Sequence, residues 1–295
     1  MPFSTIGIMS PGVMGSGIGR FLAKNGYRVV TALDGRSEFT RRRAAENGFE
    51  DLGDLESVVA GSDLVLSILD PAKAVPLARD AAAAMKRTNR RPVFADCNAT
   101  SPQTACEMQG VIEGAGAVFI DVGIVGARPT EKSFPVFATS GAEADLLAEL
   151  DGKAVKIMKI GPEVGQGSAV KICNGAYNKG AFALYTVVML AAEHYGCTGF
   201  LRERLPHSQA GTVPLLDEAL NRLPALSGRY VGEMEQVAET FDSIGLPGGF
   251  HAASAALFRM LDATSLGSEQ REQVDPNRNS LDVLKMLVAE IEAKG

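Results

Sequence analysis

The chain has 295 residues, 46% of them hydrophobic and 22% charged, which is an ordinary globular mixture for one large domain or two smaller ones. Its net charge of −6 argues against nucleic acid as the main partner, and no basic leader or long apolar segment indicates a signal peptide or a membrane span. Four cysteines without C-x-x-C spacing and three scattered histidines indicate neither a disulfide framework nor a metal site. We therefore expect a cytoplasmic protein.

Apolar, β-branched runs alternate with helical patterns over the first half of the chain. Strands are predicted at residues 4–9, 28–33, 63–69, 92–96 and 117–121, with weaker candidates at 134–138 and 154–159. Helices are predicted between them at 14–25, 37–47, 72–87, 102–114 and 142–150. This alternation is typical of βαβ units that build a mostly parallel sheet.

The pattern changes near Gly161 and Pro162. From Gln166 to about Tyr195 the chain predicts one long helix, apolar on nearly every side, and such a helix is buried in a helical domain or a subunit interface. Further helices are predicted at 199–222, 229–245, 249–263 and 280–293, and a polar loop at 265–279. The sequence thus predicts an α/β domain over residues 1–162 and an all-α domain over residues 163–295, linked by the long helix.

The turn after the first predicted strand carries a glycine pattern that suits a nucleotide phosphate. It fits G-x-G-x-x-G at Gly12 and Gly15, but serine stands at position 10. Gly12 would let the backbone approach a pyrophosphate, Gly15 would let the helix pack closely on the strand, and proline after Ser10 favours a different tight turn. A strand, turn and helix without a ligand is the alternative. We expect the cofactor to contact Ser10, Pro11, Gly12, Val13 and Met14.

The second predicted strand ends at Asp34, 19 residues after Gly15. An acidic side chain at this distance accepts the ribose hydroxyls of NAD. Arg36 and Ser37 would instead hold the 2′-phosphate of NADP, with charge added by the arginines at 41–43 unless these form only a solvated helix face. We expect NADP, and NAD is the alternative if Asp34 points into the ribose pocket.

Lys171 lies one turn into the long apolar helix, after Gly165 and Gly167. A lysine in such a place is exposed in a cleft, paired with another group, or deprotonated because of burial, and the last case makes a general base near neutral pH. Asn174 and Asn178 lie on the same face of the helix, at i+3 and i+7. A surface lysine is the alternative. We predict Lys171 and Asn174 to be catalytic and Asn178 to bind the substrate.

Together these segments resemble the β-hydroxyacid dehydrogenase superfamily, which includes 3-hydroxyisobutyrate and 6-phosphogluconate dehydrogenases and has imine reductases as relatives. The resemblance covers most of the chain and is strongest over residues 3–180. Five segments carry it, each similar to a family motif: Gly12 to Gly15 (G-x-M-G), Leu69-Asp70-Pro71 (the loop past the nicotinamide), Asp96-Cys97-Asn98 (a strand end near nicotinamide and substrate), Asp121 to Ala127 (D-x-P-V-S-G-G) and Gly165 to Lys171 (G-x-G-x-x-x-K).

The resemblance implies a Rossmann-type N-terminal domain and an NAD(P)-dependent dehydrogenase or reductase that acts on a hydroxy acid or a related alcohol or carbonyl compound. It implies that Lys171 is the general acid and base. It also implies further contacts, to the cofactor from Leu69, Asp70 and Asn98, and to the substrate from Val125, Gly126 and Ala127.

The chain departs from the family pattern in the substrate pocket. Val125 stands in place of the substrate-binding serine, Gly175 in place of an asparagine, and Gly232-Glu233 where the family has a second lysine. These changes hint at a substrate that is less anionic or bulkier than the small hydroxy acids. With these changes the chain resembles a divergent branch of the superfamily, which has an uncharacterised, phosphogluconate-dehydrogenase-like C-terminal domain.

The helical half offers three more substrate-binding candidates. Arg229 and Tyr230 would close the pocket, where Arg229 suits a carboxylate or phosphate, and His251 would carry a proton or anchor a polar group. A solvent-exposed arginine and a helix-terminal histidine are the alternatives. Two other functions fit the sequence, imine reduction in the same fold and a non-catalytic NADPH-binding module. The expected partners are a small-molecule substrate and a second copy in a homodimer through the helical domain, with neither nucleic acid nor membrane.

Overall fold

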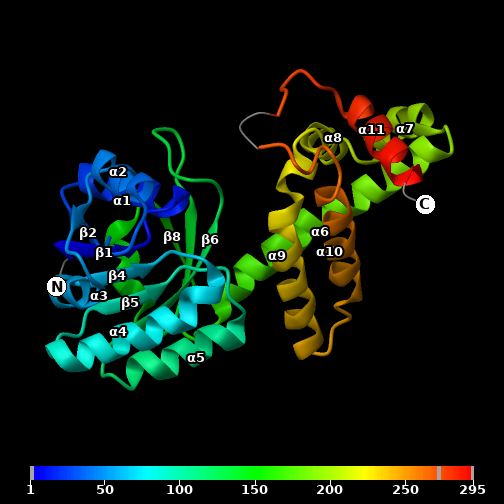
Figure 1. The fold of residues 1–295 in the computed structure, drawn as a ribbon. Helices are drawn as coiled ribbons and strands as arrows, with labels where there is room; N and C mark the ends of the chain where they lie inside the picture. The colour runs from blue at the N-terminus through cyan, green and yellow to red at the C-terminus, as the bar shows by residue number, and fades with distance from the viewer. Residues whose placement is uncertain (1–2, 271–273, 294–295) are drawn as a thin grey trace. The chain divides into compact units, whose positions relative to one another are not determined.

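The computed structural model describes residues 3–270 and 274–293 and divides into two compact units (Figure 1). The division falls between Ile172 and Cys173, inside the long helix α6 (Gln166–His194). The sequence places its domain boundary ten residues earlier, after residue 162. The N-terminal unit extends further because the first turns of α6 bond to strands of the sheet, as described below.

The N-terminal unit is built on one eight-stranded sheet with the order β3-β2-β1-β4-β5-β6-β7-β8. Its only antiparallel neighbours among the described strands are β6 and β7, because the connection over residues 126–135 is shorter than the crossover that a parallel pair needs. The predicted, mostly parallel α/β sheet is thus confirmed. The strands are β1 (Thr5–Met9), β2 (Arg28–Thr31), β3 (Glu50–Asp51), β4 (Leu64–Ser67), β5 (Val93–Asp96), β6 (Phe119–Val125), β7 (Val136–Ser140) and β8 (Lys156–Gly161).

Helices cover both faces of this sheet, because successive side chains of each strand point to opposite faces. On one face Ile6 and Leu64 pack in a core with α1 (Val13–Lys24), α2 (Glu38–Glu46) and the 3-10 helix η2 (Ala144–Leu150). On the other face Val65 and Phe94 pack with α3 (Leu55–Gly61), α4 (Ala74–Thr88) and α5 (Pro102–Glu113). A short 3-10 helix, η1 (Pro71–Lys73), precedes α4.

The sequence misses one strand and one helix and misassigns a third element. Strand β3 has two exposed residues and α3 has seven residues, so neither is long enough to show a periodicity. Helix α3 is nonetheless capped in the usual way, since Asp54 accepts a hydrogen bond from the Ser57 amide at 2.8 Å. The helix predicted at 142–150 is a 3-10 helix and not an α-helix.

The C-terminal unit is helical, as predicted, and α9 and α10 pack against each other (Figure 1). The helix predicted at 199–222 is two helices, and the second has Pro214 in its first turn. The helix predicted at 229–245 begins earlier, at Leu223. The helices after α6 are α7 (Thr198–Ser208), α8 (Val213–Leu220), α9 (Leu223–Ser243), α10 (Gly249–Asp262) and α11 (Ser280–Glu292).

Helix α6 is not buried on every side within one copy of the chain. Tyr177 is 71% exposed, Leu184 52% and Val187 48%. The subunit interface that the sequence suggests for this helix stays a prediction. No helix among residues 3–270 and 274–293 is long and apolar enough to cross a membrane.

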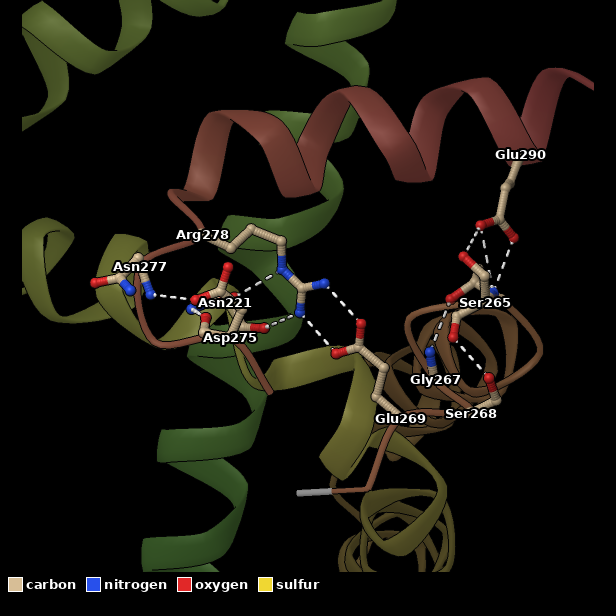
Figure 2. Close-up of polar contacts among 10 residues, drawn as sticks. Asn221, Ser265, Gly267, Ser268, Glu269, Asp275, Asn277, Arg278 and Glu290 are labelled. Atoms are coloured by element: carbon tan, nitrogen blue, oxygen red, sulfur yellow. Dashed lines mark hydrogen bonds and ion pairs between the residues drawn. The ribbon is translucent and has the colours of Figure 1, made fainter. Parts of the chain in front are cut away.

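Hydrogen bonds and an ion pair hold the predicted polar loop after α10 near both of its ends (Figure 2). Both terminal nitrogens of Arg278 donate to the carboxylate of Glu269, at 2.7 and 2.8 Å, and its Nε donates to Asn221 Oδ1 at 3.0 Å. At the other end Glu290 of α11 accepts the backbone amide of Ser265. Residues 271–273 of this loop lie outside the described residues.

Candidate active site

The turn after β1 keeps a glycine-like backbone although it has serine at position 10. Ser10 has φ +77°, one of two positive-φ non-glycine residues in the described chain. The Gly12 amide donates to the Ser10 carbonyl at 2.8 Å, which closes a tight turn around Pro11. A Cβ on Gly15 would lie 2.7 Å from that carbonyl oxygen, so Gly15 is required by close approach. The predicted different tight turn is therefore present.

Helix α1 starts at this turn with its first amides open to an external acceptor. Gly12 is the N-cap, and no described side chain caps the helix. A Cβ at Gly12 would meet nothing within 4 Å, so the backbone is approachable there. Val13 is 60% exposed and Met14 is half-buried. A helix N-terminus of this kind binds phosphate through its free N–H groups and its dipole.

Asp34 and Arg36 are both exposed at the end of β2. Ser37 caps α2, because its Oγ accepts the Thr40 amide at 3.3 Å. The three arginines of α2 have partners inside the chain: Arg41 donates to the Leu33 carbonyl, Arg42 pairs with Glu46 at 3.9 Å, and Arg43 stacks over Phe39. Arg36 is therefore the arginine of this region best placed to meet an external phosphate.

Asn98 is the centre of a buried network that joins the ends of β4 and β5. Its Oδ1 accepts the Leu69 amide at 2.6 Å, and its Nδ2 donates to Ser67 Oγ at 2.8 Å and to Asp96 Oδ1 at 2.6 Å. Asn98 is only 3% exposed and Asp96 is fully buried. Burial raises the pKa of Asp96 to about 6, against hydrogen bonds from Ser67 and Asn98 that lower it. The amide of Asn98 thus orients the Leu69 loop.

Asp70 and Cys97 flank this network and have ordinary structural roles. Asp70 is exposed and caps η1, since its Oδ1 accepts the Ala72 amide at 3.1 Å. The Cys97 thiol is buried, and burial raises its pKa well above the usual value. A thiol in this state is a poor nucleophile, so Cys97 is a packing residue here.

The start of α6 is bonded to β6 through the buried carboxylate of Asp121. This carboxylate accepts four hydrogen bonds, from Ser140 Oγ, from the Gly165 and Ser168 amides, and from Ser168 Oγ at 2.6 Å. Asp121, Ser140 and Ser168 are each 0% exposed. A carboxylate at a helix N-terminus satisfies free amides and complements the helix dipole. This network fixes the first turn of α6 against the sheet.

Two glycines let α6 approach β6 closely enough to place Lys171. A Cβ on Gly123 would clash with the Gly167 carbonyl oxygen, and a Cβ on Gly167 would lie 2.5 Å from the Ala138 oxygen. One turn later, Lys171 Nζ donates to the Ile124 carbonyl at 2.8 Å. Lys171 is half-buried. Strand β6 therefore positions this lysine through two contacts: Gly123 lies against Gly167 one turn earlier, and Ile124 accepts the hydrogen bond from Lys171 itself.

The segment of the substrate motif begins inside β6 and ends in the loop that follows. Val125 is the last residue of β6 and is half-buried, while Gly126 and Ala127 are exposed. Gly126 has φ +109°, a conformation that side chains other than hydrogen disfavour. These residues follow the carbonyl that holds Lys171 and lie at the same strand end.

The predicted polar residues farther along α6 and on α9 form two small clusters. Asn178 Nδ2 donates to the backbone oxygen of Asn174 at 2.9 Å, and both residues are exposed. Glu233 joins Arg229, at 3.3 Å, to Lys179 of α6, at 2.6 Å. The remaining member of this second cluster is Tyr230, whose ring faces the Lys179 ammonium at 5.2 Å.

His251 lies apart from that cluster, near the start of α10. It is 7% exposed and packs edge to face on Phe241 and Phe250, with ring centroids 4.9 and 5.2 Å away. Burial lowers its pKa. Sequence reasoning found the residue but not its aromatic surroundings.

In the N-terminal unit the predicted residues thus lie around the ends of β1, β2, β4, β5 and β6, and in the helical unit they lie in two clusters, with His251 apart. Sequence reasoning gave no role to the residues that hold them, and the local signal was a hydrogen-bonding side chain in or beside a named motif. These residues are Ser67 and Asp96 around Asn98, Ser140 and Ser168 around Asp121, and Lys179 and Glu233 beside Tyr230. Within the part of the chain that the structure describes, no three His, Cys, Asp or Glu residues could hold a metal ion.

Two protein-family models match the chain. Residues 5–151 match the NAD binding domain of 6-phosphogluconate dehydrogenase, and residues 192–261 match a domain of unknown function (DUF1932). The N-terminal unit is therefore an NAD-binding domain, which agrees with the phosphate turn after β1.

Three curated proteins are similar to the chain. An uncharacterised 28.5 kDa protein of Methanothermus fervidus is 28% identical over 69% of the chain and 77% of its own length. An uncharacterised oxidoreductase of Synechocystis is 27% identical over 59% of the chain, and the mitochondrial 3-hydroxyisobutyrate dehydrogenase of Drosophila melanogaster is 28% identical over 57%. The matched regions span 61% and 52% of these last two proteins.

Solved structures share the fold across nearly the whole chain. A conserved hypothetical protein from Sinorhizobium meliloti has a TM-score of 0.76 and 24% identity, covering 97% of this chain and 96% of its own. The 3-hydroxyisobutyrate dehydrogenase of Mycobacterium tuberculosis has a TM-score of 0.71, 20% identity and coverages of 93% and 98%. An imine reductase of Streptomyces aurantiacus has a TM-score of 0.57, 19% identity and coverages of 92% and 98%. At these identities the likeness concerns the fold.

Proposed function

We propose that the chain, which belongs to a divergent branch of the β-hydroxyacid dehydrogenase superfamily, is an NAD(P)-dependent oxidoreductase with Lys171 as its general acid and base. The observation that carries the proposal is the placement of Lys171, whose Nζ donates to the Ile124 carbonyl of β6 at 2.8 Å. The bonded carbonyl lies one residue before the end of β6, at the carboxyl end of a strand in the NAD-binding domain. In open α/β sheets, ligands bind outside the carboxyl ends of the strands.

The residues around the β1 turn fit a dinucleotide. The uncapped N-terminus of α1 would hold the pyrophosphate, because its first amides have no side-chain acceptor and Gly12 leaves the backbone approachable. The Leu69 amide, fixed by Asn98, would flank the nicotinamide half. When bound, NAD(P)⁺ supplies the acceptor for a hydride from the substrate carbon.

In the oxidation direction, Lys171 as a neutral amine takes the proton of the substrate hydroxyl while the carbon loses its hydride. The products are the carbonyl compound, the reduced cofactor and a protonated Lys171, which passes its proton to water. In reduction, Lys171 gives this proton to the carbonyl oxygen. The hydrogen bond to the Ile124 carbonyl would hold Lys171 Nζ in place in both directions, so that the same nitrogen can take up and return the proton.

The proposed substrate is a hydroxy acid or a related alcohol or carbonyl compound. Val125 offers no hydroxyl to a carboxylate, and Gly232 stands where the resemblance places a second lysine. Both changes weaken binding of a small anion, so less anionic compounds belong in the first screen. Hydroxy acids are tested with NADP⁺ and NAD⁺, and aldehydes, ketones and imines with NADPH and NADH, all at the nicotinamide absorbance.

The catalytic role is tested by Lys171→Met on the best substrate of that screen. Methionine keeps the length of the side chain and removes the amine, so kcat is expected to fall by roughly 10²–10⁴-fold with cofactor affinity within about threefold of wild type. The matched control is Lys159→Met, which removes an exposed lysine paired with Asp145. Turnover of Lys171→Met close to wild type would refute the role. Cofactor binding without turnover of any substrate by wild type would favour a non-catalytic NADPH-binding module.

We further propose NADP as the preferred cofactor, with Arg36 as the residue that meets the 2′-phosphate. Arg36→Ala is expected to lower the kcat/KM ratio of NADPH to NADH by about tenfold or more, because a charge-assisted hydrogen bond contributes about 1.5–3 kcal/mol. Asp34→Ser is expected to raise the same ratio. A wild type that prefers NADH, and loses that preference in Asp34→Ser, would reverse the assignment.

A phenolic proton donor for imine reduction is disfavoured at Tyr185. Its hydroxyl donates to Asp217 Oδ1 at 2.9 Å, and burial and this carboxylate raise its pKa. Such a phenol keeps its proton. The imines in the screen test this alternative directly.

A further inference from the structure

The N-terminal unit has a cavity of about 440 Å³ along one face of α1. Its walls come from α1, from the end of α2, and from residues 128–131 in the connection between β6 and β7. The α1 wall includes Val13, Ser16, Gly17 and Arg20, which stand at i, i+3, i+4 and i+7 and so share one side of the helix. The volume lies in the range of small-molecule sites.

The wall formed by the β6–β7 connection is held against α1. Pro129 is buried, and a Cβ on Gly17 would lie only 3.1 Å from its Cδ, so a glycine favours this close approach. Two residues later in the chain, Glu131 forms an ion pair with Lys24 at the end of α1. Tertiary packing therefore builds the cavity without the help of a ligand.

Positive charge prevails in this cavity. Three arginines and two glutamates line it: Arg20, Arg43, Arg128, Glu46 and Glu131. Each glutamate pairs with a cation that does not line the cavity, Glu46 with Arg42 at 3.9 Å and Glu131 with Lys24. The guanidinium groups are thus in excess, in a chain whose net charge is −6.

Two of the three arginines have donor groups to spare. Among the described residues, no side-chain hydrogen bond or ion pair engages Arg20 or Arg128, and both are exposed to a ligand from solution. The pKa of Glu131 is lowered mainly by its hydrogen bond from Lys24, and the charge of Arg20 contributes less.

These two arginines favour a phosphoryl group over other anions. The forked donors of a guanidinium match the oxygens of a phosphate. A phosphate monoester carries a charge of about −2 near pH 7, which balances both Arg20 and Arg128, whereas a single carboxylate would balance only one of them.

The cavity is distinct from the expected cofactor contacts. Only Val13 belongs to both, and from there the cavity follows α1 for about two turns, away from the phosphate turn. We propose that this cavity binds a small compound through a phosphoryl group held between Arg20 and Arg128, in addition to the dinucleotide. The site lies within the N-terminal unit and does not depend on the chemistry of Lys171.

The test titrates inorganic pyrophosphate into the full-length protein by isothermal titration calorimetry, at low ionic strength and with saturating NADPH. One pyrophosphate per chain is expected to bind saturably, because NADPH leaves the cavity open. Arg20→Gln and Arg128→Gln are each expected to weaken it by about tenfold or more, since each loses a charge-assisted hydrogen bond. Acetate, with one negative charge, is expected to bind wild type at least about tenfold more weakly.

Two further variants place the site. Arg204→Gln is the matched control, because it removes an exposed arginine of α7 that does not line the cavity, and it is expected to leave pyrophosphate binding unchanged. Glu131→Gln removes a carboxylate from the wall and is expected to strengthen pyrophosphate by about threefold or more.

Three results overturn the proposal. Wild type that binds no pyrophosphate has no such site, and equal weakening in the Arg20, Arg128 and Arg204 variants shows that only net charge matters. Pyrophosphate that binds without NADPH and is lost with it shows that the cavity is part of the cofactor site. If NADPH itself does not bind, the arginine variants still test the cavity, so failure of the proposed function is told apart from failure of this site.

Discussion

The contact between α6 and the sheet predicts a strong effect of a single methyl group at Gly167. In Gly167→Ala the new Cβ would lie 2.5 Å from the Ala138 oxygen, 3.0 Å from the Asp121 oxygen and 3.1 Å from Asp121 Oδ2. Two of these three atoms belong to the backbone of β7 and β6, so a rotamer change cannot relieve the clash. The first turn of α6 must move away from the sheet.

The size of this movement follows from the distances. An ordinary contact of about 3.4 Å to the Ala138 oxygen requires a shift of roughly 0.9 Å, and Lys171 follows one turn later on the same helix. A displacement of about 1 Å at a reacting group costs about 10²-fold in rate. Overpacking of this kind costs about 1–3 kcal/mol in the free energy of unfolding. Cofactor affinity is expected to stay within about threefold, because the phosphate turn follows β1, which is separated from β6 by β4 and β5.

The assay compares kcat, cofactor affinity by fluorescence titration, and urea unfolding for wild type and two variants. The matched control is Gly175→Ala, the same change on the same helix, where the new Cβ meets only Lys179 Nζ at 3.7 Å. Helix propensity then stabilises the control by up to about 1 kcal/mol. If Gly167→Ala keeps kcat within threefold of wild type, or if both variants lose activity equally, close approach does not position Lys171 and the reasoning fails.

Three further changes test single interactions. Ser10→Gly removes the cost of a positive φ, and this gain exceeds the entropy that glycine adds to the unfolded chain. Urea unfolding is therefore expected to show a free energy of unfolding higher by about 0.5–1 kcal/mol. A lower value would show that the serine side chain stabilises the turn. Asp96 has its pKa raised by burial from 3.8 to about 6, so its contribution to stability is fully present below about pH 4 and is lost, by about 3 kcal/mol, as pH rises through 6. Asp96→Asn should therefore gain stability relative to wild type over that interval, and an unchanged difference between pH 4 and 7 would contradict the buried, titrating carboxyl. Tyr185→Phe removes a hydrogen bond to the Asp217 carboxylate, so thermal unfolding is expected to show a free energy of unfolding lower by about 1–2 kcal/mol. No change would mean that the hydrogen bonds from Arg202 and Ser280 are enough for this carboxylate.

Much of the fold follows from local patterns. The strands β1, β2, β4 and β5 are short β-branched runs between helical patterns, which is why the sequence predicts them. Very short elements are harder to predict from the sequence, because β3 and α3 span two and seven residues and have too few positions to show a periodicity. The single helix predicted at 199–222 shows the opposite error, since apolar spacing continues across the turn between α7 and α8.

By itself the sequence determined the α/β organisation, and it predicted the glycine turn after β1 and Lys171 as the candidate acid and base, because each depends on residues close together in the chain. Only the tertiary structure decided how that lysine is held. Asp121 bonds the Ser168 amide and Ile124 accepts from Lys171, each across 47 residues, and these contacts exist because Gly123 and Gly167 let α6 lie against β6. Likewise Asn98 reaches Leu69 across 29 residues only because β4 and β5 are neighbours in the sheet. Strand pairing and close packing bring distant residues together, and no local pattern encodes which partner a polar side chain will meet.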